Sequence, residues 1–207
     1  MIVVHHLNDS RSQRILWLLE ELAIPYEIKF YQRDPQTRLA PPELKAVHPL
    51  GKSPVVTDNG RVIIESGAII DDIIRHHGNG RLQPPVGTPA YDEYAQWLHF
   101  AEGSAMLPLL LKLYVSRLGD AGAPLHPRIE SEIASHLGFI NDSLAGKPYL
   151  LGEALTAADI QMSFVGELAA TRTDRTAYPN LDAWVHRFQA RPAYKAALAR
   201  GGPYSFA

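Results

Sequence analysis

The chain changes pattern once, at a stretch rich in glycine and proline, and this change limits the folds open to it. Before the stretch, short β-branched runs alternate with helical segments; after it, every periodic segment has helical spacing. The stretch itself, Gly78-Asn79-Gly80 followed by residues 84–89, has the composition of a linker. We therefore predict an α/β domain over residues 1–79, a linker over 80–87 and an all-helical bundle over 88–207.

The N-terminal part predicts the order β-α-β-α-β-β-α. Residues 2–7 and 26–31 indicate strands on either side of a helix that Pro25 ends, which implies a parallel pair with a crossover helix. Asp58-Asn59-Gly60 lies between two further β-rich runs and is a strong hairpin signal. The sheet should therefore be a parallel pair extended by an antiparallel hairpin.

The C-terminal part predicts helices only. They are expected at residues 91–118, 129–144, 157–170, 181–191 and 193–200. Pro108 should kink the first of them, because proline interrupts the hydrogen-bond ladder of a helix. Thr156 and Asp159 form a variant of the capping box at the start of the third.

Composition excludes several classes of function. The net charge of -2 gives no electrostatic case for nucleic acid or an anionic membrane as a partner. No apolar run reaches membrane-spanning length, and the first residues lack the pattern of a signal peptide, so we expect a cytoplasmic location. The chain has no cysteine, so the sulfur of any thiol chemistry must arrive on a ligand. We expect no metal, since the adjacent pairs His5-His6 and His76-His77 diverge in a strand or helix.

Polar residues follow the first predicted strand. Ser10 stands at the start of a helix, where a hydroxyl caps the helix or donates a hydrogen bond to an anion held there. Asn8 and Ser12 are near enough to take either role. At this stage all three remain candidates.

Two further places at strand ends can be explained either by ligand binding or by an ordinary structural role. Ser66 can cap the helix after it, where the free N–H groups favour an anionic group, and Glu65 could bind an amine. Pro54 opens a strand, and a cis Ser53–Pro54 bond would turn the Val55 backbone outward to pair with an extended peptide. From spacing alone, a plain N-cap and a trans proline are the more common readings.

Four motifs together resemble the glutathione transferase superfamily over essentially the whole chain. They are Ser10-x-x-x-Arg14 leading into Leu18-Leu19-Glu20-Glu21, His48-Pro49-Leu50-Gly51-Lys52-Ser53-Pro54-Val55, Glu65-Ser66-Gly67-Ala68-Ile69-Ile70, and Leu155-Thr156-Ala157-Ala158-Asp159-Ile160. The resemblance implies a thioredoxin-like N-terminal domain and a helical C-terminal domain. Within this superfamily the chain is similar to a serine-type, bacterial and fungal-like subgroup, because no tyrosine follows the first strand and the chain has no cysteine.

The resemblance also implies roles for matching positions. Ser10 would hydrogen-bond the glutathione sulfur, and Pro54 would be a cis-proline next to a Val55 backbone that pairs with the cysteinyl part. Glu65 and Ser66 would hold the γ-glutamyl end of the tripeptide. Lys52 would contact the glycyl carboxylate at the other end, with His48 a weaker candidate for that contact.

A homodimer is implied as well, formed by the helix after Ser66 and the helix from Tyr91. Four apolar residues could supply the wall of the electrophile pocket, although a buried core explains them equally well: Trp97, Phe100, Met106 and Leu107. The segment 100–104, with Glu102, resembles the same subgroup and would line that pocket or the dimer cleft.

The function implied is conjugation of glutathione to a small hydrophobic electrophile. Two rivals stay open: a glutathione-dependent peroxide or disulfide reductase without a protein cysteine, and a non-catalytic glutathione-binding protein of the same fold. Conjugation and reduction begin with the same thiolate, so the sequence does not separate them.

Overall fold

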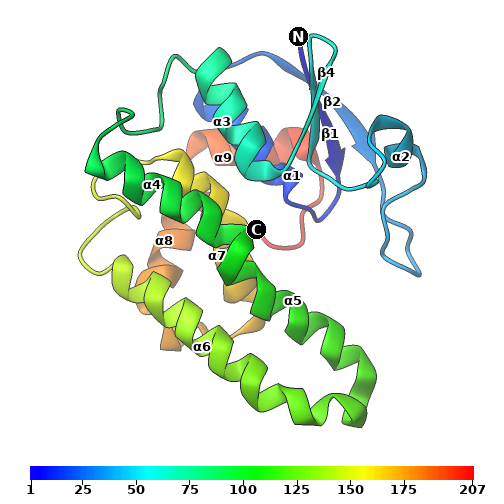
Figure 1. Cartoon of the computed structure of the whole chain (residues 1–207), viewed down its shortest axis with the longest axis vertical. Helices are drawn as coiled ribbons and strands as arrows, with labels where there is room; N and C mark the ends of the chain where they lie inside the picture. The colour runs from blue at the N-terminus through cyan, green and yellow to red at the C-terminus, as the bar shows by residue number, and fades with distance from the viewer. The chain divides into compact units, whose positions relative to one another are not determined.

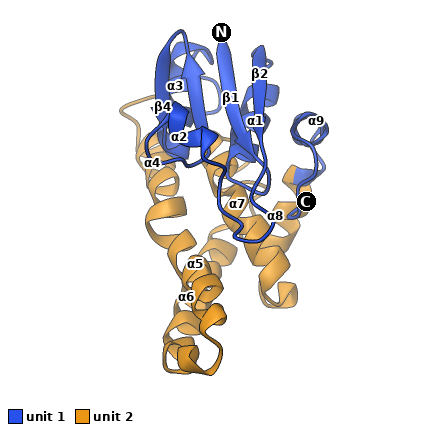
Figure 2. Cartoon of the chain, turned by 90° about the vertical axis from the view of Figure 1, so that its right-hand side faces the viewer, with its two compact units in different colours: residues 1–83, 189–207 blue, residues 84–188 orange.

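The structure, a computed structural model, describes all 207 residues and divides into two compact units (Figure 2). Unit 1 comprises residues 1–83 and 189–207, and unit 2 comprises residues 84–188. This division differs from the predicted one, because the last 19 residues pack with the N-terminal segment rather than with the helices before them.

Unit 1 is an α/β structure. Its elements are β1 (Ile2–Leu7), α1 (Ser12–Glu21), β2 (Tyr26–Tyr31), α2 (Glu43–Val47), β3 (Val55–Asp58), β4 (Arg61–Ile64), α3 (Ser66–His76) and α9 (Pro192–Gly201). The strand order is β2-β1-β3-β4, with β1 and β2 parallel and the other neighbours antiparallel. The predicted order β-α-β-α-β-β-α and the predicted sheet are confirmed.

Helices cover both faces of this sheet, with α1 and α3 on one face and α2 on the other (Figure 1). Leu44 of α2 packs against Leu7 and Tyr31, the last residues of β1 and β2. The hairpin between β3 and β4 turns at Asn59 and Gly60, both of which have the positive φ that a two-residue hairpin turn requires.

Helix α1 explains why the end of the chain belongs to unit 1. All its residues from Ser12 to Leu19 are buried, so the sheet and α3 alone do not cover it. Helix α9 lies against it, with the rings of Trp17 and Tyr194 edge to face at 5.4 Å. An ion pair of 2.9 Å joins Arg200 of α9 to Glu20 of α1.

Unit 2 is helical. Its elements are α4 (Pro89–Phe100), the π-helical turn η1 (Ala101–Ala105), α5 (Met106–Val115), the 3-10 segment η2 (Ser116–Leu125), α6 (His126–Ser143), α7 (Ala157–Arg172), the 3-10 turn η3 (Arg175–Ala177) and α8 (Pro179–Gln189). None of the helices combines the length and the apolar character that crossing a bilayer requires.

The irregularity in the first helical stretch of unit 2 lies before Pro108 rather than at it. Residues 101–105 form the π-helical turn η1, and Pro108 stands in the first turn of α5. A proline ring clashes with the carbonyl four residues back, and the extra residue of a π turn shifts that carbonyl out of register. The predicted single kinked helix is therefore two helices joined by η1.

Helix α7 is the centre of unit 2 and is buried from Ala157 to Ala169. Its predicted capping box is confirmed: the Asp159 carboxylate accepts from the Thr156 backbone N–H at 2.9 Å. Asp159 also accepts from Leu150 N at 2.9 Å and from Trp184 Nε1 at 3.0 Å. This one carboxylate therefore joins the loop before α7, the helix start and α8.

Candidate functional site

Three loop segments of unit 1 meet at one end of the sheet, which we call the open end. His5 of β1, Val55 of β3 and Ile64 of β4 form one row across three strands. Because β3 runs antiparallel to both neighbours, the chain beyond this row continues into residues 8–10, 52–54 and 65–66. The sheet thus gathers, at one edge, the site residues predicted from all three segments.

Ser10 is almost completely buried in the turn between β1 and α1, with 4% of its surface exposed. Its Oγ accepts from the Ser12 backbone N–H at 3.2 Å and lies 2.8 Å from Ser12 Oγ. The same oxygen is 3.4 Å from Ser53 Oγ, in the segment before β3. Ser10 is therefore fixed at the helix start and also borders the second segment of the open end.

Ser12 lies one layer deeper than Ser10. Its hydroxyl is fully buried, 2.8 Å from His6 Nδ1, and accepts from Leu7 N at 3.3 Å. Burial lowers the pKa of His6 to about 4, against the opposing effect of a hydrogen bond to the Gly201 backbone. The imidazole is therefore neutral at physiological pH, and the hydroxyl of Ser12 is committed to the protein interior.

Asn8 bonds to the end of β2 and to the residues that follow it. Its Oδ1 accepts from the Arg33 backbone N–H at 2.8 Å, and its carbonyl accepts from Arg33 Nε at 3.0 Å. The side chain that competes with Ser10 in the sequence is thus occupied in holding two chain segments together.

The Ser53–Pro54 peptide bond is cis, as predicted. Val55, in contrast, lies inside the sheet rather than at its edge. Val55 is buried and lies opposite His5 on one side and Ile64 on the other, so β3 has no open edge at this residue. Strand addition needs an unpaired edge. The residue at the open end is Ser53, which precedes the strand and whose Oγ donates to the His5 carbonyl at 2.9 Å.

Ser66 is the first residue of α3, and the residue at its N-cap position is Glu65. The predicted Ser66 cap is therefore wrong by one position. Its buried Oγ instead accepts from Arg14 Nη1 of α1 at 3.3 Å. This bond ties the start of α3 to α1, one turn beyond Ser10.

Glu65 has an unusual backbone. Its φ of 66° lies in the left-handed region, which side chains other than Gly, Asn and Asp rarely adopt. Its carboxylate is exposed and forms no hydrogen bond or ion pair within the chain. Strained residues of this kind cluster at ligand sites.

Lys52 is the positive counterpart of Glu65 at the open end. It is exposed, two residues before Pro54, and its ammonium group has no partner in the chain. His48, four residues earlier, is half-buried and accepts weakly from Leu50 N at 3.4 Å. The open end therefore presents one free cation and one free anion beside the buried hydroxyls.

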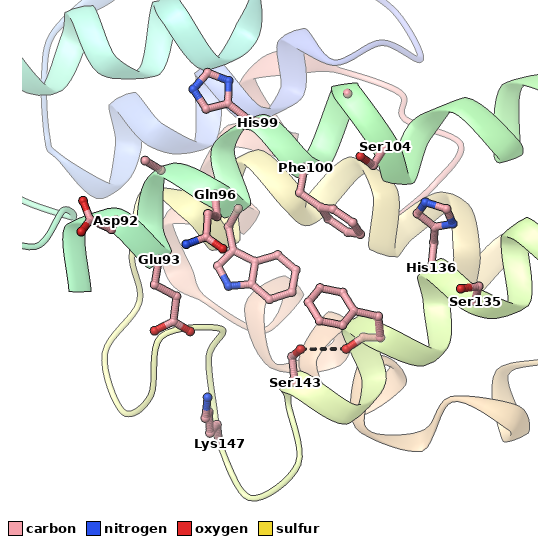
Figure 3. A pocket seen from close by; sticks show the side chains of 14 residues that line it. Asp92, Glu93, Gln96, His99, Phe100, Ser104, Ser135, His136, Ser143 and Lys147 are labelled. Carbon is pink, nitrogen blue, oxygen red and sulfur yellow. Dashed lines mark hydrogen bonds between the residues drawn. The ribbon is translucent and has the colours of Figure 1, made fainter. Parts of the chain in front are cut away.

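Unit 2 holds a separate cavity of about 1230 Å³ along α4 and α6 (Figure 3). Its wall contains Trp97 and Phe139, stacked at 5.4 Å, and Phe100, stacked on His136 at 5.8 Å. Phe139 is 54% exposed.

Of the predicted pocket residues, Trp97 and Phe100 line this cavity, whereas Met106 is buried in the core and Leu107 is exposed outside it. Glu102 is in η1 and does not line it.

The sequence patterns do not identify Ser53 and His6 as parts of the site. The signal for Ser53 was available, since it precedes the proline that was singled out. No local signal marks His6, because its contact with Ser12 depends on the packing of β1 under α1. No group of three or more His, Asp or Glu side chains is arranged to hold a metal ion.

Two family models match the chain. The one described as "Glutathione S-transferase, N-terminal domain" matches residues 1–73, and the one described as "Glutathione S-transferase, C-terminal domain" matches residues 123–187. Among curated relatives, Glutathione S-transferase 3 of Schizosaccharomyces pombe is 36% identical over 97% of this chain and 88% of its own length. Glutathione S-transferase 1 of Saccharomyces cerevisiae is 30% identical, over 95% and 93%.

Solved structures agree. A glutathione S-transferase from Actinobacillus pleuropneumoniae has a TM-score of 0.91 at 35% identity, covering 100% of this chain and 95% of its own. A glutathione transferase family member from Pseudomonas fluorescens, solved with two glutathione bound, has a TM-score of 0.80 at 25% identity, covering 95% and 92%. Unit 1 thus carries a thioredoxin-like fold, joined to a helical C-terminal domain. The chain belongs to the glutathione S-transferase family, as the four motifs predicted.

Proposed function

We propose that the open end of unit 1 binds glutathione, and that the bound thiolate is conjugated to a small hydrophobic electrophile. The observation that carries this proposal is the position of the Ser10 hydroxyl, 3.4 Å from Ser53 Oγ and next to the cis-proline. Family membership supports glutathione as the ligand. A cytoplasmic location remains part of the proposal.

Ser10, rather than Asn8 or Ser12, is proposed to face the sulfur. The side chain and carbonyl of Asn8 are held by Arg33, in the segment after β2, and the hydroxyl of Ser12 is directed at His6. A free cysteine thiol has a pKa near 8.5, so little of it is thiolate at neutral pH. A hydroxyl donor at a helix N-terminus favours the anion and lowers that pKa.

The ends of the tripeptide are proposed to lie on the charged rim of the open end. The amino group of the γ-glutamyl part suits the unpaired carboxylate of Glu65, and its carboxylate suits the N-terminus of α3 at Ser66. The glycyl carboxylate suits Lys52. Because β1 and β4 flank β3 on both sides at Val55, we assign the backbone pairing with the cysteinyl part to Ser53, on the other side of Pro54.

Titration of bound glutathione tests the proposal. The ultraviolet absorbance of the thiolate gives the pKa of bound glutathione in the wild type and in Ser10→Ala, Ser12→Ala and Asn8→Ala. Removing a hydrogen bond to a charged group costs about 1.5–3 kcal/mol, so Ser10→Ala should raise that pKa by about one to two units. The dissociation constant for glutathione should change little. An unchanged pKa in Ser10→Ala would overturn the role of Ser10.

A small hydrophobic electrophile suits the exposed apolar stripe that α5 of unit 2 carries. Leu107, Leu111 and Tyr114 are 41–56% exposed and follow the i, i+4, i+7 spacing that puts them on one face. Leu111→Ser should raise KM for a chloronitrobenzene electrophile and leave glutathione affinity unchanged. The same assay run with a peroxide and with a disulfide shows whether reduction, rather than conjugation, is the main activity.

A two-fold homodimer is proposed to form through α3 and α4. The cavity of unit 2 supports it, since Phe139 is 54% exposed beside Trp97 and Phe100 in the cavity wall, and exposed apolar groups of this kind are typical of an interface.

Light scattering tests the dimer. Phe139→Asp should give a monomer, because it places a charge in the aromatic cluster. Phe30→Asp is the matched control: Phe30 is 55% exposed but lies on β2, so the dimer should persist. A monomeric wild type at micromolar concentration would refute the proposal.

A further inference from the structure

The turn that carries Ser10 is held by groups far from it in the sequence. Asp9, the residue before Ser10, has a φ of 49°, in the left-handed region. The guanidinium of Arg33 donates to the carbonyls of Asn8 and Asp9, at 3.0 and 3.2 Å. These bonds fix the backbone on the strand side of the turn.

The side chain of Asp9 makes the other attachments. Its Oδ1 accepts from the backbone N–H of Ser205 at 2.9 Å, and its Oδ2 accepts from Arg38 Nη2 at 3.0 Å. Burial opposes ionisation of Asp9, but the hydrogen bonds from Ser205 and Arg38 outweigh it and keep its pKa below the usual value. Asp9 is therefore a charged acceptor whose two oxygens hold two distant segments.

Ser205 belongs to the C-terminal tail, residues 202–207, which follows α9. Gly202, with a φ of 82°, turns the chain away from the helix axis. A cavity of about 110 Å³ separates the tail from the strands, lined in part by His6, Asp9, Gly201 and Ser205. The bond from Ser205 N joins the tail to Asp9, and a second bond, from Gln189 Nε2 to the Phe206 carbonyl at 3.4 Å, joins the tail to the segment before α9.

We propose that Asp9 is a positioning residue: its bonds to Ser205 and Arg38 hold the turn so that the adjacent Ser10 hydroxyl reaches the sulfur of bound glutathione. The inference rests on the proposed function of Ser10. It adds that the last residues of the chain act on the thiolate through Asp9, without touching the ligand. Geometry within a few tenths of an ångström decides the strength of such a hydrogen bond.

Charge and position predict opposite effects, which makes the proposal testable. Removing the negative charge of Asp9 by itself favours a nearby thiolate and lowers the thiol pKa. Releasing the turn weakens the Ser10 hydrogen bond and raises that pKa. Ser205→Pro separates the two, because it removes the donating N–H and leaves the charge of Asp9 in place.

The experiment measures the pKa of bound glutathione by thiolate absorbance, together with kcat and KM for glutathione. Ser205→Pro should raise the pKa by about one unit, a tenfold smaller ratio of thiolate to thiol. Lower kcat at unchanged KM should accompany it. Ser205→Ala keeps the N–H and loses only the side-chain bond to Asp9, so it should shift the pKa less than Ser205→Pro does. Asp9→Asn keeps an acceptor for Ser205 and tolerates the left-handed backbone but loses the ion pair with Arg38, so any rise in the pKa should be clearly smaller than in Ser205→Pro.

A wild-type pKa in Ser205→Pro would overturn the positioning role while leaving the proposed function intact. A rise in Asp9→Asn as large as in Ser205→Pro would also overturn it, because the bond to Ser205 would then be immaterial. An unchanged pKa in Ser10→Ala would remove the proposed function, and this inference with it. The tail is exposed at Ser205, so folding of the Ser205 variants, checked by circular dichroism, does not depend on the core.

Discussion

Asp159 in unit 2 and Ser10 in unit 1 are both buried polar residues at the start of a helix, yet their surroundings differ. Asp159 accepts from the loop before α7, from the helix start and from Trp184 of α8, all inside the unit. Ser10 bonds inward to Ser12 but stands beside a rim where Lys52 and Glu65 have no partner. A closed network of this kind contributes to stability, whereas an open one leaves bonding capacity for a ligand.

The largest expected effect on stability is at Asp159. Asp159→Ala leaves the donors Leu150 N, Thr156 N and Trp184 Nε1 without their acceptor in a buried site. Unsatisfied buried donors cost about 1–3 kcal/mol each and are not additive, so we expect a loss of about 4 kcal/mol. Urea denaturation measures it. Ser10→Ala serves as the comparison, with an expected loss of about 1 kcal/mol; equal losses would remove the distinction between the two networks.

The second effect depends on pH and concerns the inner end of the Ser10 network. The pKa of His6 is about 4 in the folded chain and 6.5 when unperturbed, so the unfolded chain takes up a proton first as pH falls. The contribution of His6 is therefore complete above pH 6.5 and is lost as pH falls toward 4, by about 3 kcal/mol in all.

Denaturation between pH 7 and pH 4 should therefore show a steeper fall in the wild type than in His6→Gln, which does not titrate. The pKa of His5 is also lowered, by burial and then by Lys29, but His5 is present in both proteins and cancels. Parallel curves would show that His6 is not a buried neutral group.

The third effect concerns close packing in unit 2. A Cβ at Gly166 of α7 would lie 2.5 Å from Trp184 Cζ3 and 3.1 Å from Val185 Cγ2. Gly166→Ala should therefore cost about 1–2 kcal/mol, despite the better helix propensity of alanine. In α6, Gly138 has no atom within 4 Å of the same position, so Gly138→Ala should instead stabilise by about 0.5–1 kcal/mol. The two melting temperatures should move in opposite directions.

The smallest effect is at the open end, and it is expected to be favourable. Glu65→Gly relieves a left-handed backbone and should raise stability by about 0.5–1 kcal/mol. Glu65→Gln keeps the strained backbone and should leave stability unchanged. Both variants should weaken glutathione binding, measured by calorimetry, because both lose the carboxylate. Unchanged affinity in both would exclude Glu65 from the site.

Local patterns predicted much of this structure. The hairpin at Asn59-Gly60 and the capping box at Thr156 depend on residues close in sequence, and both are present. The cis bond before Pro54 was predicted from the family motif rather than from spacing. Ser10 was singled out with Asn8 and Ser12, and only the bonds of the latter two to Arg33 and His6 separate them.

The failures depend on register and on distant parts of the chain. Whether Val55 or Ser53 stands at the sheet edge depends on how far the ladder with β1 and β4 extends, which no composition rule fixes. Ser66 is the first residue of α3 rather than its predicted N-cap residue, because Glu65, with its unusual backbone, occupies the N-cap position. The place of α9 depends on the exposed side of α1, some 170 residues earlier in the chain.

The division of unit 1 between two distant segments affects the order in which the chain can fold during synthesis. Unit 2 is one continuous segment, whereas unit 1 combines residues 1–83 with residues 189–207. On the ribosome, the sheet and α1 emerge long before α9. Two acidic residues of α1 then lack their partners: Glu20 pairs with Arg200 of α9, and Glu21 pairs with Arg191 just before it. The helical unit is therefore complete in sequence before the unit that begins the chain. We expect the N-terminal part to wait, with one side of α1 uncovered, until α9 has been translated.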